Sequence, residues 1–517
     1  MPPERGFMED ICSQYNLLEA NEGVIRIPFM VKGRIISPPA ISSEQVKAAF
    51  EEAGDEVSYL KMPDMQLIRE PVIDSNSMRY NGAFFYKVLP SVDGIKLIET
   101  DTDKLAQGLY ALPVEDILDY LGSILSTLVK NPALLKKVYR LYHLTAEEPG
   151  IFLDDCFHSL KTAFDPAAAR LMIDRELSFW GVPGGEFLNE WVKLPPPAET
   201  LVRAMPTRQL HITAGNALEV PLISALRAVL TKSAAVIKCP SAAVLSGALL
   251  ALTAATAEPE HPITKNLSIV YWQGGDKGIE NTLFAPGAFD RIVVWGSPET
   301  VASVQSRALY SRIICLNPRY GVSLIGEEAF SNDLREVAAR ACADTIIHNQ
   351  KACTSSLVHY VEGTEEQVRL YAGLLQQELA GWDDRAPQFI SPSARGSVKR
   401  MQRGRYSLAD WYINRRDGEF SSGVVVAQGE FDILDHPMCR LIVVRRVDDL
   451  ADAAKYLHPG VSTAGIYPEE RRLLIRDVVA ARGVSSILPL GQCNSIFAGM
   501  PHDGMVVLNQ LVDWKVA

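Results

Sequence analysis

The sequence predicts an α/β protein with a doubly wound parallel sheet, a second α/β domain and a small C-terminal extension. Three observations lead to this prediction: strand-like runs alternate with helical patterns from Arg208 onward, a second alternating set follows from Asn332, and the first hundred residues are β-rich in pattern. Strands that alternate with helices imply β-α-β crossovers and hence parallel pairing. Sheets of this kind bind ligands at the carboxyl ends of their strands.

The N-terminal part begins with strands and continues with helices. Residues 24–36 and 83–89 are short apolar or alternating runs bounded by Gly, Pro and Asn, which is typical of strands. From Pro113 onward apolar residues recur with helical spacing. Asn131-Pro132 and Asp165-Pro166 each combine an N-cap residue with a first-turn proline, so a helix is expected to start at each of them.

The two alternating sets account for most of the remaining chain. In the first set, strands are expected at residues 209–213, 234–238, 267–272, 291–295 and 312–316, with helices between them. In the second set, helices are expected at residues 332–348, 364–380 and 448–457, and strands at residues 357–362 and 440–447. Residues 382–420 are charged and irregular in pattern, so we expect them to form an excursion over the surface.

Composition and charge exclude several classes of protein. The 517 residues include 51 Lys+Arg and 62 Asp+Glu, a net charge of −11, which argues against a general nucleic-acid binder. A content of 47% hydrophobic and 22% charged residues excludes a largely disordered chain. No apolar run approaches the ~20 residues of a membrane span. Residues 1–10 are acidic and lack the apolar run of a secretory signal.

The eight cysteines do not form CxxC pairs, so neither a disulfide framework nor a metal site is indicated, and a cytoplasmic location is expected. Cys353 differs from the others because it lies in a polar turn of small residues between a helix and an apolar strand. A thiol in such a turn can be exposed and partly ionised, as a nucleophile requires. The alternative is a small buried hydrophobe. That interpretation is kept for Cys12, Cys156, Cys239, Cys315, Cys342, Cys439 and Cys493.

Residues 350–354, Gln-Lys-Ala-Cys-Thr, resemble the nucleophile motif of the aldehyde dehydrogenase superfamily. Residues 211–216, 236–241 and 294–297 resemble, in the same order, the superfamily segments for the oxyanion hole, for the cofactor ribose, and for the cofactor nicotinamide and pyrophosphate. More narrowly, the chain resembles the LuxC-type acyl-CoA reductases, the fatty-acid reductase component of bacterial bioluminescence systems, and residues 502–504 look LuxC-like as well. The resemblance covers about residues 100–517.

The resemblance implies an aldehyde-dehydrogenase-like fold with a defined domain order. We expect a β-rich region at residues 1–100, an NAD(P)-binding domain at 101–317, a catalytic domain carrying Cys353 at 318–484, and a C-terminal segment for oligomerisation or sheet extension at 485–517. A homo-oligomer, dimer or tetramer, is expected, with the apolar stretch 505–514 joining a neighbour's sheet.

The resemblance also assigns roles to individual residues. Cys353 is the expected nucleophile, and the Asn216 side chain and the Cys353 backbone N–H are the expected oxyanion donors. Lys238 and Ser241 are expected at the cofactor ribose, and Gly296 and Ser297 under the nicotinamide and pyrophosphate. Read from the residues alone, Asn216 could instead be a turn residue and Lys238 a solvated charge.

Two departures from the superfamily pattern bear on the reaction. The segment 315–321 lacks the Glu that activates water in oxidising members, so the acyl-Cys is expected to be protected from hydrolysis. Ser241 stands where NAD-preferring members often carry Glu, which removes repulsion against a 2′-phosphate and favours NADPH. The loop 435–440 replaces the superfamily's second cofactor Glu motif and has no assigned role.

The expected function is therefore NADPH-dependent reduction of an acyl thioester to an aldehyde through an acyl thioester on Cys353. The acyl donor could be acyl-CoA, an acyl-carrier protein or a partner acyl-protein synthetase. Three alternatives remain: a CoA-acylating aldehyde dehydrogenase that works oxidatively, an enzyme similar to glutamyl-phosphate reductase, and a catalytically silent scaffold of an acyl-transfer complex.

Overall fold

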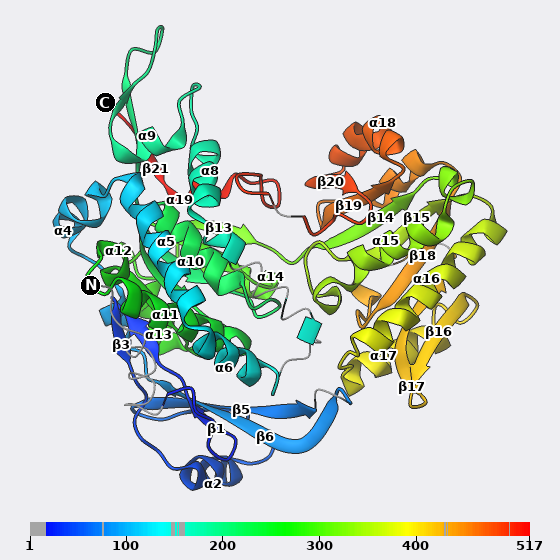
Figure 1. Cartoon of the computed structure of the whole chain (residues 1–517), viewed down its shortest axis with the longest axis horizontal. Helices are drawn as coiled ribbons and strands as arrows, with labels where there is room; N and C mark the ends of the chain where they lie inside the picture. Colours follow the sequence, from blue (N-terminus) through cyan, green and yellow to red (C-terminus); the bar gives the residue numbers. More distant parts are fainter. Residues whose placement is uncertain are drawn as a thin grey trace.

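The computed structural model describes residues 17–74, 77–145, 150, 151, 154, 161–428, 431, 433–495 and 497–517. The chain forms two lobes, each built around a seven-stranded sheet (Figure 1). We call residues 17–317 together with 505–517 the N-terminal lobe, and residues 318–490 the C-terminal lobe. The predictions made for residues 1–10, Cys12 and Cys156 lie outside the described residues.

The main sheet of the N-terminal lobe has the strand order β13-β12-β9-β10-β11-β2-β3. All five strands predicted for the first alternating set are present and parallel, and all but the last are almost completely buried, as is usual in parallel sheets. They are β9 (Arg208–Ile212), β10 (Ala234–Lys238), β11 (Leu267–Val270), β12 (Arg291–Trp295) and β13 (Arg312–Leu316). The short strands β2 (Phe29–Val31) and β3 (Arg34–Ile36) extend the sheet in antiparallel pairing.

Helices cover this sheet and connect its strands. The crossover helices are α10 (Val220–Leu230), α11 (Val244–Ala257), α12 (Pro262–Lys265), α13 (Lys277–Leu283) and α14 (Pro298–Gln305). The preceding helices are α2 (Ser43–Ala53), α3 (Gly94–Leu97), α4 (Thr102–Gln107), α5 (Val114–Lys130), α6 (Pro132–Tyr142), α8 (Pro166–Glu176) and α9 (Gly184–Asn189). Helices α6 and α8 start at the two predicted prolines, and Asp165 caps α8 by accepting from two backbone N–H groups.

A long hairpin links the two lobes. Strands β5 (Met65–Asp74) and β6 (Arg79–Pro90) form a four-stranded sheet with β1 (Val24–Arg26) and β4 (Tyr59–Lys61), and the hairpin runs along the bottom of Figure 1 to the C-terminal lobe. At the hairpin tip, the Arg79 side chain lies 3.3 Å from Asp417, and the Tyr80 ring centroid lies 4.7 Å from that of Phe389. The hairpin is therefore anchored at both ends.

The C-terminal lobe has the strand order β16-β17-β18-β15-β14-β19-β20, in which only β16 is antiparallel to its neighbour. Its strands are β14 (Tyr320–Ile325), β15 (Ser356–Glu362), β16 (Asp410–Arg416), β17 (Glu419–Val426), β18 (Leu441–Val447), β19 (Val461–Tyr467) and β20 (Ser486–Pro489). Its helices are α15 (Leu334–Ile346), α16 (Glu365–Arg385), α17 (Pro392–Arg403) and α18 (Glu469–Ala480).

The prediction that residues 382–420 form an irregular excursion is wrong. Helix α16 continues to Arg385, α17 occupies twelve residues, and β16 pairs with β17 in a hairpin. Helix α17 is amphipathic, with Val398 and Met401 buried while Lys399, Arg400 and Arg403 are exposed. The helical pattern was missed because a narrow apolar face of this kind is hidden among charged residues.

The structure also shows how residues 505–514 pack within the chain. Helix α19 (Val507–Leu511) lies in the core of the chain's own N-terminal lobe, where Leu508 and Leu511 are fully buried. Strand β21 (Asp513–Val516) then pairs with β8 (Leu201–Met205), which pairs with β7 (Val192–Lys193). These apolar side chains are thus used within the chain, although β21 is an edge strand of its three-stranded sheet.

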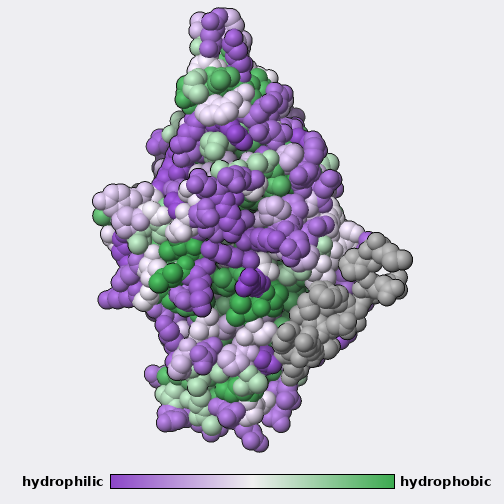
Figure 2. Space-filling model, turned by 90° about the vertical axis from the view of Figure 1, so that its left-hand side faces the viewer, coloured by the Kyte–Doolittle hydropathy of each residue, from purple (hydrophilic) through white to green (hydrophobic). Residues whose placement is uncertain are grey.

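Helix length and apolar character decide whether a helix of the described part of the chain could cross a membrane. No helix there combines the length and the apolar character that crossing a bilayer requires. Figure 2, which views the N-terminal lobe from its outer side, shows mostly hydrophilic side chains and one group of hydrophobic ones at mid-height.

Candidate active site

The strand order of the N-terminal lobe creates a crevice at β9 and β12. The chain runs from β9 to β10 on one side and later returns to β12 on the other side of β9. At such a switch point the connections leave in opposite directions, and ligands bind outside the carboxyl ends of the strands. Asn216 follows β9, Lys238 ends β10, and Gly296 and Ser297 follow β12. Four of the predicted site residues therefore lie at this one edge of the sheet.

Cys353 lies in the turn between the 3-10 helix η4 (Ile347–Gln350) and strand β15. The Asn216 amide nitrogen donates to the backbone oxygen of Lys351 at 3.2 Å, and this hydrogen bond joins the two lobes. The Ser462 hydroxyl donates to the Cys353 carbonyl oxygen. The structure thus brings the predicted oxyanion donor to the nucleophile turn, and the second hydrogen of the Asn216 amide remains for another acceptor.

The loop 435–440, whose role the sequence left open, holds this turn through Arg440. His348, Asn349 and Gln350 all have positive φ angles, of 44°, 57° and 66°. The buried Arg440 Nε donates to Asn349 Oδ1 at 2.9 Å, while its Nη1 lies 3.1 Å from Asp383 Oδ1. Gln350 Nε2 donates to the backbone oxygen at the start of β18 at 2.8 Å. The left-handed conformation that leads into Cys353 is therefore fixed by buried partners.

The C-terminal part of the chain contributes two residues that the sequence reasoning did not assign. After β20 the chain returns to the N-terminal lobe, and His502 and Asp503 lie on this return (Figure 1). The Cys353 Sγ atom, a ring nitrogen of His502 and a carboxylate oxygen of Asp503 lie within 4.8 Å of one another. The only signal for this was the LuxC-like segment 502–504, since no spacing pattern connects residues so far apart in the chain.

Asp503 corrects one conclusion drawn from the sequence. The segment 315–321 indeed lacks a carboxylate, but Asp503 supplies one beside Cys353 from another part of the chain. A comparison of aligned segments could not reveal this, because the residue comes from a different element. Because a carboxylate does lie beside Cys353, the absence of one from segment 315–321 no longer implies that an acyl-Cys is protected from water.

Burial and two arginines determine the charges of these groups. Burial, with a smaller contribution from Asp503, raises the pKa of Cys353 to about 11. Burial together with Arg227 and Arg319 lowers the pKa of His502 to about 3. Burial raises the pKa of Asp503, and the same two arginines partly oppose that shift. At neutral pH the resting site therefore holds a thiol and an uncharged imidazole.

Arg227 of α10 organises the N-terminal side of the site. Its Nη2 donates to His502 Nδ1 at 2.9 Å, and its guanidinium lies 5.5 Å from the ring centroid of Trp295. The rings of Trp295 and His502 meet edge to face, 5.4 Å apart. Burial lowers the pKa of Arg227 to about 10, and Glu176 and Asp503 oppose this shift, so it stays charged at neutral pH. Gly296 and Ser297 follow Trp295 directly, which places the predicted cofactor turn beside this group.

The spacing of Cys353, His502 and Asp503 would suit a metal ion, but the hydrogen bond of Arg227 argues against one. A guanidinium only donates, so Nδ1 of His502 must accept. A neutral imidazole then carries its hydrogen on Nε2 and has no free lone pair for a metal. These three side chains therefore do not fit a metal ion in this arrangement.

Two lysine side chains, Lys238 and Lys87, belong to the segment predicted to bind the cofactor ribose or contact it. The Lys238 ammonium lies 5.5 Å from the ring centroid of Tyr271, and burial lowers its pKa. Lys87 of β6, which the sequence reasoning missed, donates to the backbone oxygen of Ser241 at 3.0 Å and lies 2.5 Å from Glu70. Because Lys87 is buried and paired with Glu70, the Lys238 ammonium is the group here that fits the phosphate of a nucleotide cofactor.

The turn after β12 is tightly packed. A Cβ atom on Gly296 would lie 3.1 Å from the side chain of Thr300, so a larger residue would displace its neighbour. The Ser297 hydroxyl caps α14 by accepting from the Thr300 N–H at 3.4 Å. Both residues therefore have a structural role at the start of α14, next to the crevice.

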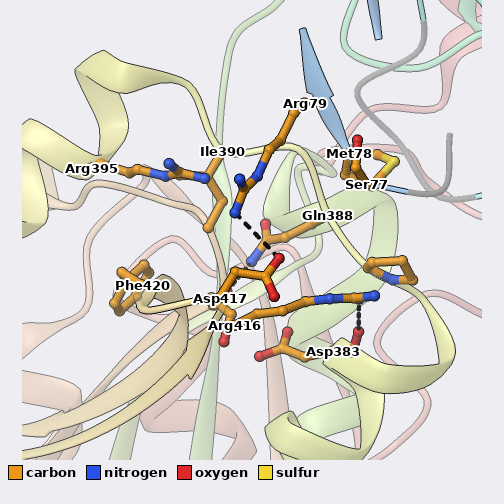
Figure 3. A pocket seen from close by; sticks show the side chains of 12 residues that line it. Ser77, Met78, Arg79, Asp383, Gln388, Ile390, Arg395, Arg416, Asp417 and Phe420 are labelled. Carbon is orange, nitrogen blue, oxygen red and sulfur yellow. Dashed lines mark hydrogen bonds and ion pairs between the residues drawn. The ribbon is translucent and has the colours of Figure 1, made fainter. Parts of the chain in front are cut away.

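A separate pocket lies between the hairpin tip and the C-terminal lobe (Figure 3). Arg79, Arg395, Arg416, Asp383 and Asp417 line it; Arg79 pairs with Asp417, and Arg416 donates to the backbone oxygen of Asp383. None of the predicted site residues lines this pocket. It is therefore distinct from the site around Cys353, although Asp383 also pairs with Arg440.

Solved structures show that this architecture is the aldehyde dehydrogenase fold. Aldehyde dehydrogenase 21 from Physcomitrella patens, solved with the reaction product succinate, superposes with a TM-score of 0.68 at 10% identity, covering 96% of this chain and 98% of that one. Lactaldehyde dehydrogenase from Escherichia coli superposes with a TM-score of 0.67 at 12% identity, covering 95% and 98%. The predicted fold class is confirmed.

Sequence comparison defines the family more narrowly. The family described as acyl-CoA reductase (LuxC) matches residues 109–514, and the chain belongs to this family. Long-chain acyl-protein thioester reductase 2 from Photobacterium leiognathi is 25% identical over 331 residues, which is 63% of this chain and 67% of that protein. Long-chain acyl-protein thioester reductase from Photorhabdus laumondii is 28% identical over 346 residues, 63% of this chain and 66% of that protein. The chain thus matches about two thirds of the length of these relatives.

Proposed function

We propose that this protein reduces an acyl thioester, of the fatty acyl class, to an aldehyde with NADPH through an acyl thioester on Cys353. The observation that carries the proposal is the hydrogen bond from Asn216, which follows β9, to the backbone oxygen of Lys351 in the turn that leads to Cys353. Membership in the acyl-CoA reductase family and the names of the relatives support the substrate class.

The chain's own groups suit the acyl-transfer half of this reaction. The Cys353 sulfur attacks the thioester carbonyl, and acyl transfer onto sulfur keeps the carbonyl activated. The Asn216 amide and the Cys353 backbone N–H are the proposed donors to the tetrahedral oxyanion, and loss of one such donor typically slows a reaction about 10²–10³-fold. NADPH, when bound at the crevice, supplies the hydride. In this proposal residues 101–317 bind the cofactor and residues 318–484 carry the nucleophile.

Cofactor preference follows from charge at the ribose end. Lys238, Ser241 and Lys87 would surround the adenosine ribose, with Gly296 and Ser297 at the nicotinamide and pyrophosphate end. Lys238 adds positive charge, while Lys87 and Glu70 are paired with each other. A 2′-phosphate would therefore meet the Lys238 ammonium and no carboxylate at residue 241, which supports NADPH.

The direct test is acylation of Cys353. Intact-mass analysis after incubation with a panel of acyl-CoAs in the absence of NADPH should reveal a single acyl adduct on the wild-type protein. Cys353→Ala should form none and should lose NADPH oxidation, measured by absorbance, because it lacks the nucleophile. Cys315→Ala is the matched control, since Cys315 is a free, partly exposed thiol outside the site. An adduct formed by Cys353→Ala at the wild-type rate would disprove the assignment.

The same assays separate the alternatives. Turnover only in the direction from aldehyde and CoA to acyl-CoA would favour an oxidative CoA-acylating dehydrogenase. An absence of turnover with every thioester would favour a scaffold.

We propose acyl-CoA, an acyl-carrier protein or an acyl-protein synthetase as the acyl donor. We also propose a cytoplasmic location, because the six cysteines in the described ranges are free thiols, as a reducing compartment would maintain them.

A further inference from the structure

We propose that Asp503 accepts the proton of the Cys353 thiol during acylation and returns it to the departing thiol, while His502 is a fixed hydrogen-bond donor that Arg227 holds in place. The proposal rests on the proposed function and adds a proton acceptor to it. His502 beside a catalytic Cys would ordinarily be taken as the base. The contacts of its ring point to the neighbouring carboxylate instead.

The hydrogen bond from Arg227 fixes the tautomer of His502. All nitrogens of a guanidinium donate and none accepts, so the 2.9 Å contact makes His502 Nδ1 the acceptor. A neutral imidazole has one N–H, which must then be on Nε2. A ring nitrogen that already bears hydrogen cannot take the thiol proton. A second protonation is also unfavourable, because the ring is buried beside Arg227 and Arg319, which lower its pKa to about 3.

Asp503 has the position and the chemistry of an acceptor. Its carboxylate lies in the same 4.8 Å cluster as the Cys353 sulfur, and its Oδ2 lies 3.9 Å from His502 Nε2 and 3.9 Å from Arg319 Nε. Its side chain is only 8% exposed, so bulk water does not compete strongly for its oxygens. Burial raises its pKa, which makes it a stronger base than an ordinary aspartate.

The other ionisable groups that face the nucleophile are poorly placed for this task. His348 precedes the turn, and its Nε2 lies 3.2 Å from Glu219 Oε1, which engages that nitrogen. Arg319 and Arg227 are cations that only donate. Glu176 accepts from the Leu508 backbone N–H at 2.9 Å at the start of α19. Asp503 is therefore the carboxylate left beside the sulfur.

The proposed step balances without any further reactant. The thiol proton moves to a carboxylate oxygen of Asp503 as the bond between the Cys353 sulfur and the acyl carbon forms. The bond from that carbon to the donor's sulfur breaks, and the donor thiolate takes the proton from Asp503. The His502 Nε2–H can donate to the sulfur while it is negatively charged, which makes His502 a positioning and stabilising residue.

The decisive experiment compares Asp503→Asn with wild type in single-turnover acylation by a long-chain acyl-CoA, followed by rapid quench and intact mass across pH 6–10. General base catalysis typically contributes 10²–10⁴-fold, so acylation at pH 7 should slow about 100-fold or more. The rate of the variant should rise about tenfold per pH unit, since hydroxide must now ionise the thiol. His502→Gln, which keeps an N–H donor, should preserve the wild-type shape of the pH profile.

A second measurement separates a chemical role from a structural one. Asp503 raises the pKa of Cys353, so removing its charge should leave alkylation of Cys353 by iodoacetamide at pH 8 equal or faster, although acylation is slower. A damaged fold would slow both. Asp477→Asn, at an exposed aspartate of α18, is the control that should match wild type in both assays.

The outcomes also distinguish this proposal from the proposed function. If wild type forms no adduct with any thioester, the proposed function fails and this inference falls with it. If wild type is acylated and Asp503→Asn is acylated equally fast at pH 7, only the role of Asp503 is overturned. That role is overturned as well if Asp503→Asn slows only hydrolysis of the acyl-enzyme, because Asp503 would then act on water.

Discussion

Cys353 is distinguished from the other cysteines by its neighbours and not by its acidity. Burial raises the pKa of Cys239 and Cys439 to about 12 and that of Cys353 to about 11, so all three are thiols at neutral pH. Only the Cys353 sulfur lies beside both a carboxylate and an imidazole in the described part of the chain. In the proposed reaction, a neighbouring proton acceptor therefore matters more for activating the Cys353 thiol than a low thiol pKa.

At the scale of single residues, position 241 should determine cofactor choice. Ser241→Glu places a carboxylate near the expected 2′-phosphate, and two unit charges about 4 Å apart at an effective dielectric of ~20 interact by roughly 4 kcal/mol before solvent relaxes. Since ~1.4 kcal/mol is a factor of ten, kcat/KM with NADPH should fall tenfold or more while NADH use is nearly unchanged. Steady-state kinetics with both cofactors measures this.

Ser241→Gln is the matched control, because it has the size of Glu without the charge. It should affect both cofactors alike and only slightly. Equal losses with NADPH and NADH in Ser241→Glu would mean that residue 241 does not face the 2′ position, and the cofactor alignment would have to be redrawn.

The sequence predicted those site residues that lie in local motifs. Cys353 and Asn216 were expected from the segments around them, and the structure brings these segments together. Lys87 and Arg227 were missed because their roles depend on contacts between elements that are far apart in the chain. The position of Asp503 beside Cys353 was missed for the same reason, although the segment 502–504 resembled the family. Local patterns contain no information on such long-range contacts.

At the scale of elements, the parallel strands of the N-terminal sheet were predicted correctly. Three of the five parallel strands, β10, β11 and β12, are mostly apolar and almost completely buried, as strands of parallel sheets usually are. Helix α17 was missed because its core contact consists of few residues, chiefly Val398 and Met401. The role of the loop before β18 was not predicted because it depends on the buried Arg440, whose partners come from the distant elements α16 and η4.

The junction of α16, η4 and β18 should be important for stability. Asp383→Ala removes the carboxylate that pairs with Arg440, whose side chain is 0% exposed, and leaves a buried charge uncompensated. Breaking a buried pair from one side typically lowers the free energy of unfolding by about 3–5 kcal/mol. The apparent midpoint of urea denaturation, followed by tryptophan fluorescence and circular dichroism, should fall accordingly.

Asp384→Ala is a suitable control, because Asp384 is the exposed neighbour on the same helix. Its midpoint should stay close to that of wild type. An equal midpoint for Asp383→Ala would show that Arg440 is compensated by other groups, such as Asn349, and that the pair with Asp383 is dispensable.

At the scale of the whole molecule, the candidate site exists only when both lobes are assembled. The N-terminal lobe supplies Asn216 and Arg227, the C-terminal lobe supplies Cys353, and the return segment supplies His502 and Asp503. The β5–β6 hairpin adds a further link between the lobes (Figure 1). Disturbing the packing of one lobe on the other should therefore impair acylation even where every site residue is intact.

We expect the protein to be a dimer or tetramer. Strand β21 is an edge strand, and the aromatic side chains of Phe179, Trp180 and Trp191 are between 39% and 50% exposed in the N-terminal lobe. Exposed apolar side chains beside an unpaired strand edge are typical of interfaces between copies. Light scattering after size-exclusion chromatography at micromolar concentration should show a mass of at least twice 56.9 kDa.

Trp180→Asp should shift this mass toward the monomer, because it places a charge among the exposed aromatic side chains. Leu408→Asp is the control, as Leu408 is 94% exposed in the C-terminal lobe. A monomeric wild-type protein would contradict the expectation outright.

The raised pKa of Cys353 also affects how the protein withstands oxidants. Peroxides attack thiolates, and sulfenic acid formation is correspondingly slow on a thiol that stays protonated. A nucleophile held as a thiol until an acyl donor arrives is thus sheltered from oxidative damage between turnovers. The burial that makes Cys353 a weak acid at rest therefore protects the one sulfur on which the proposed activity depends.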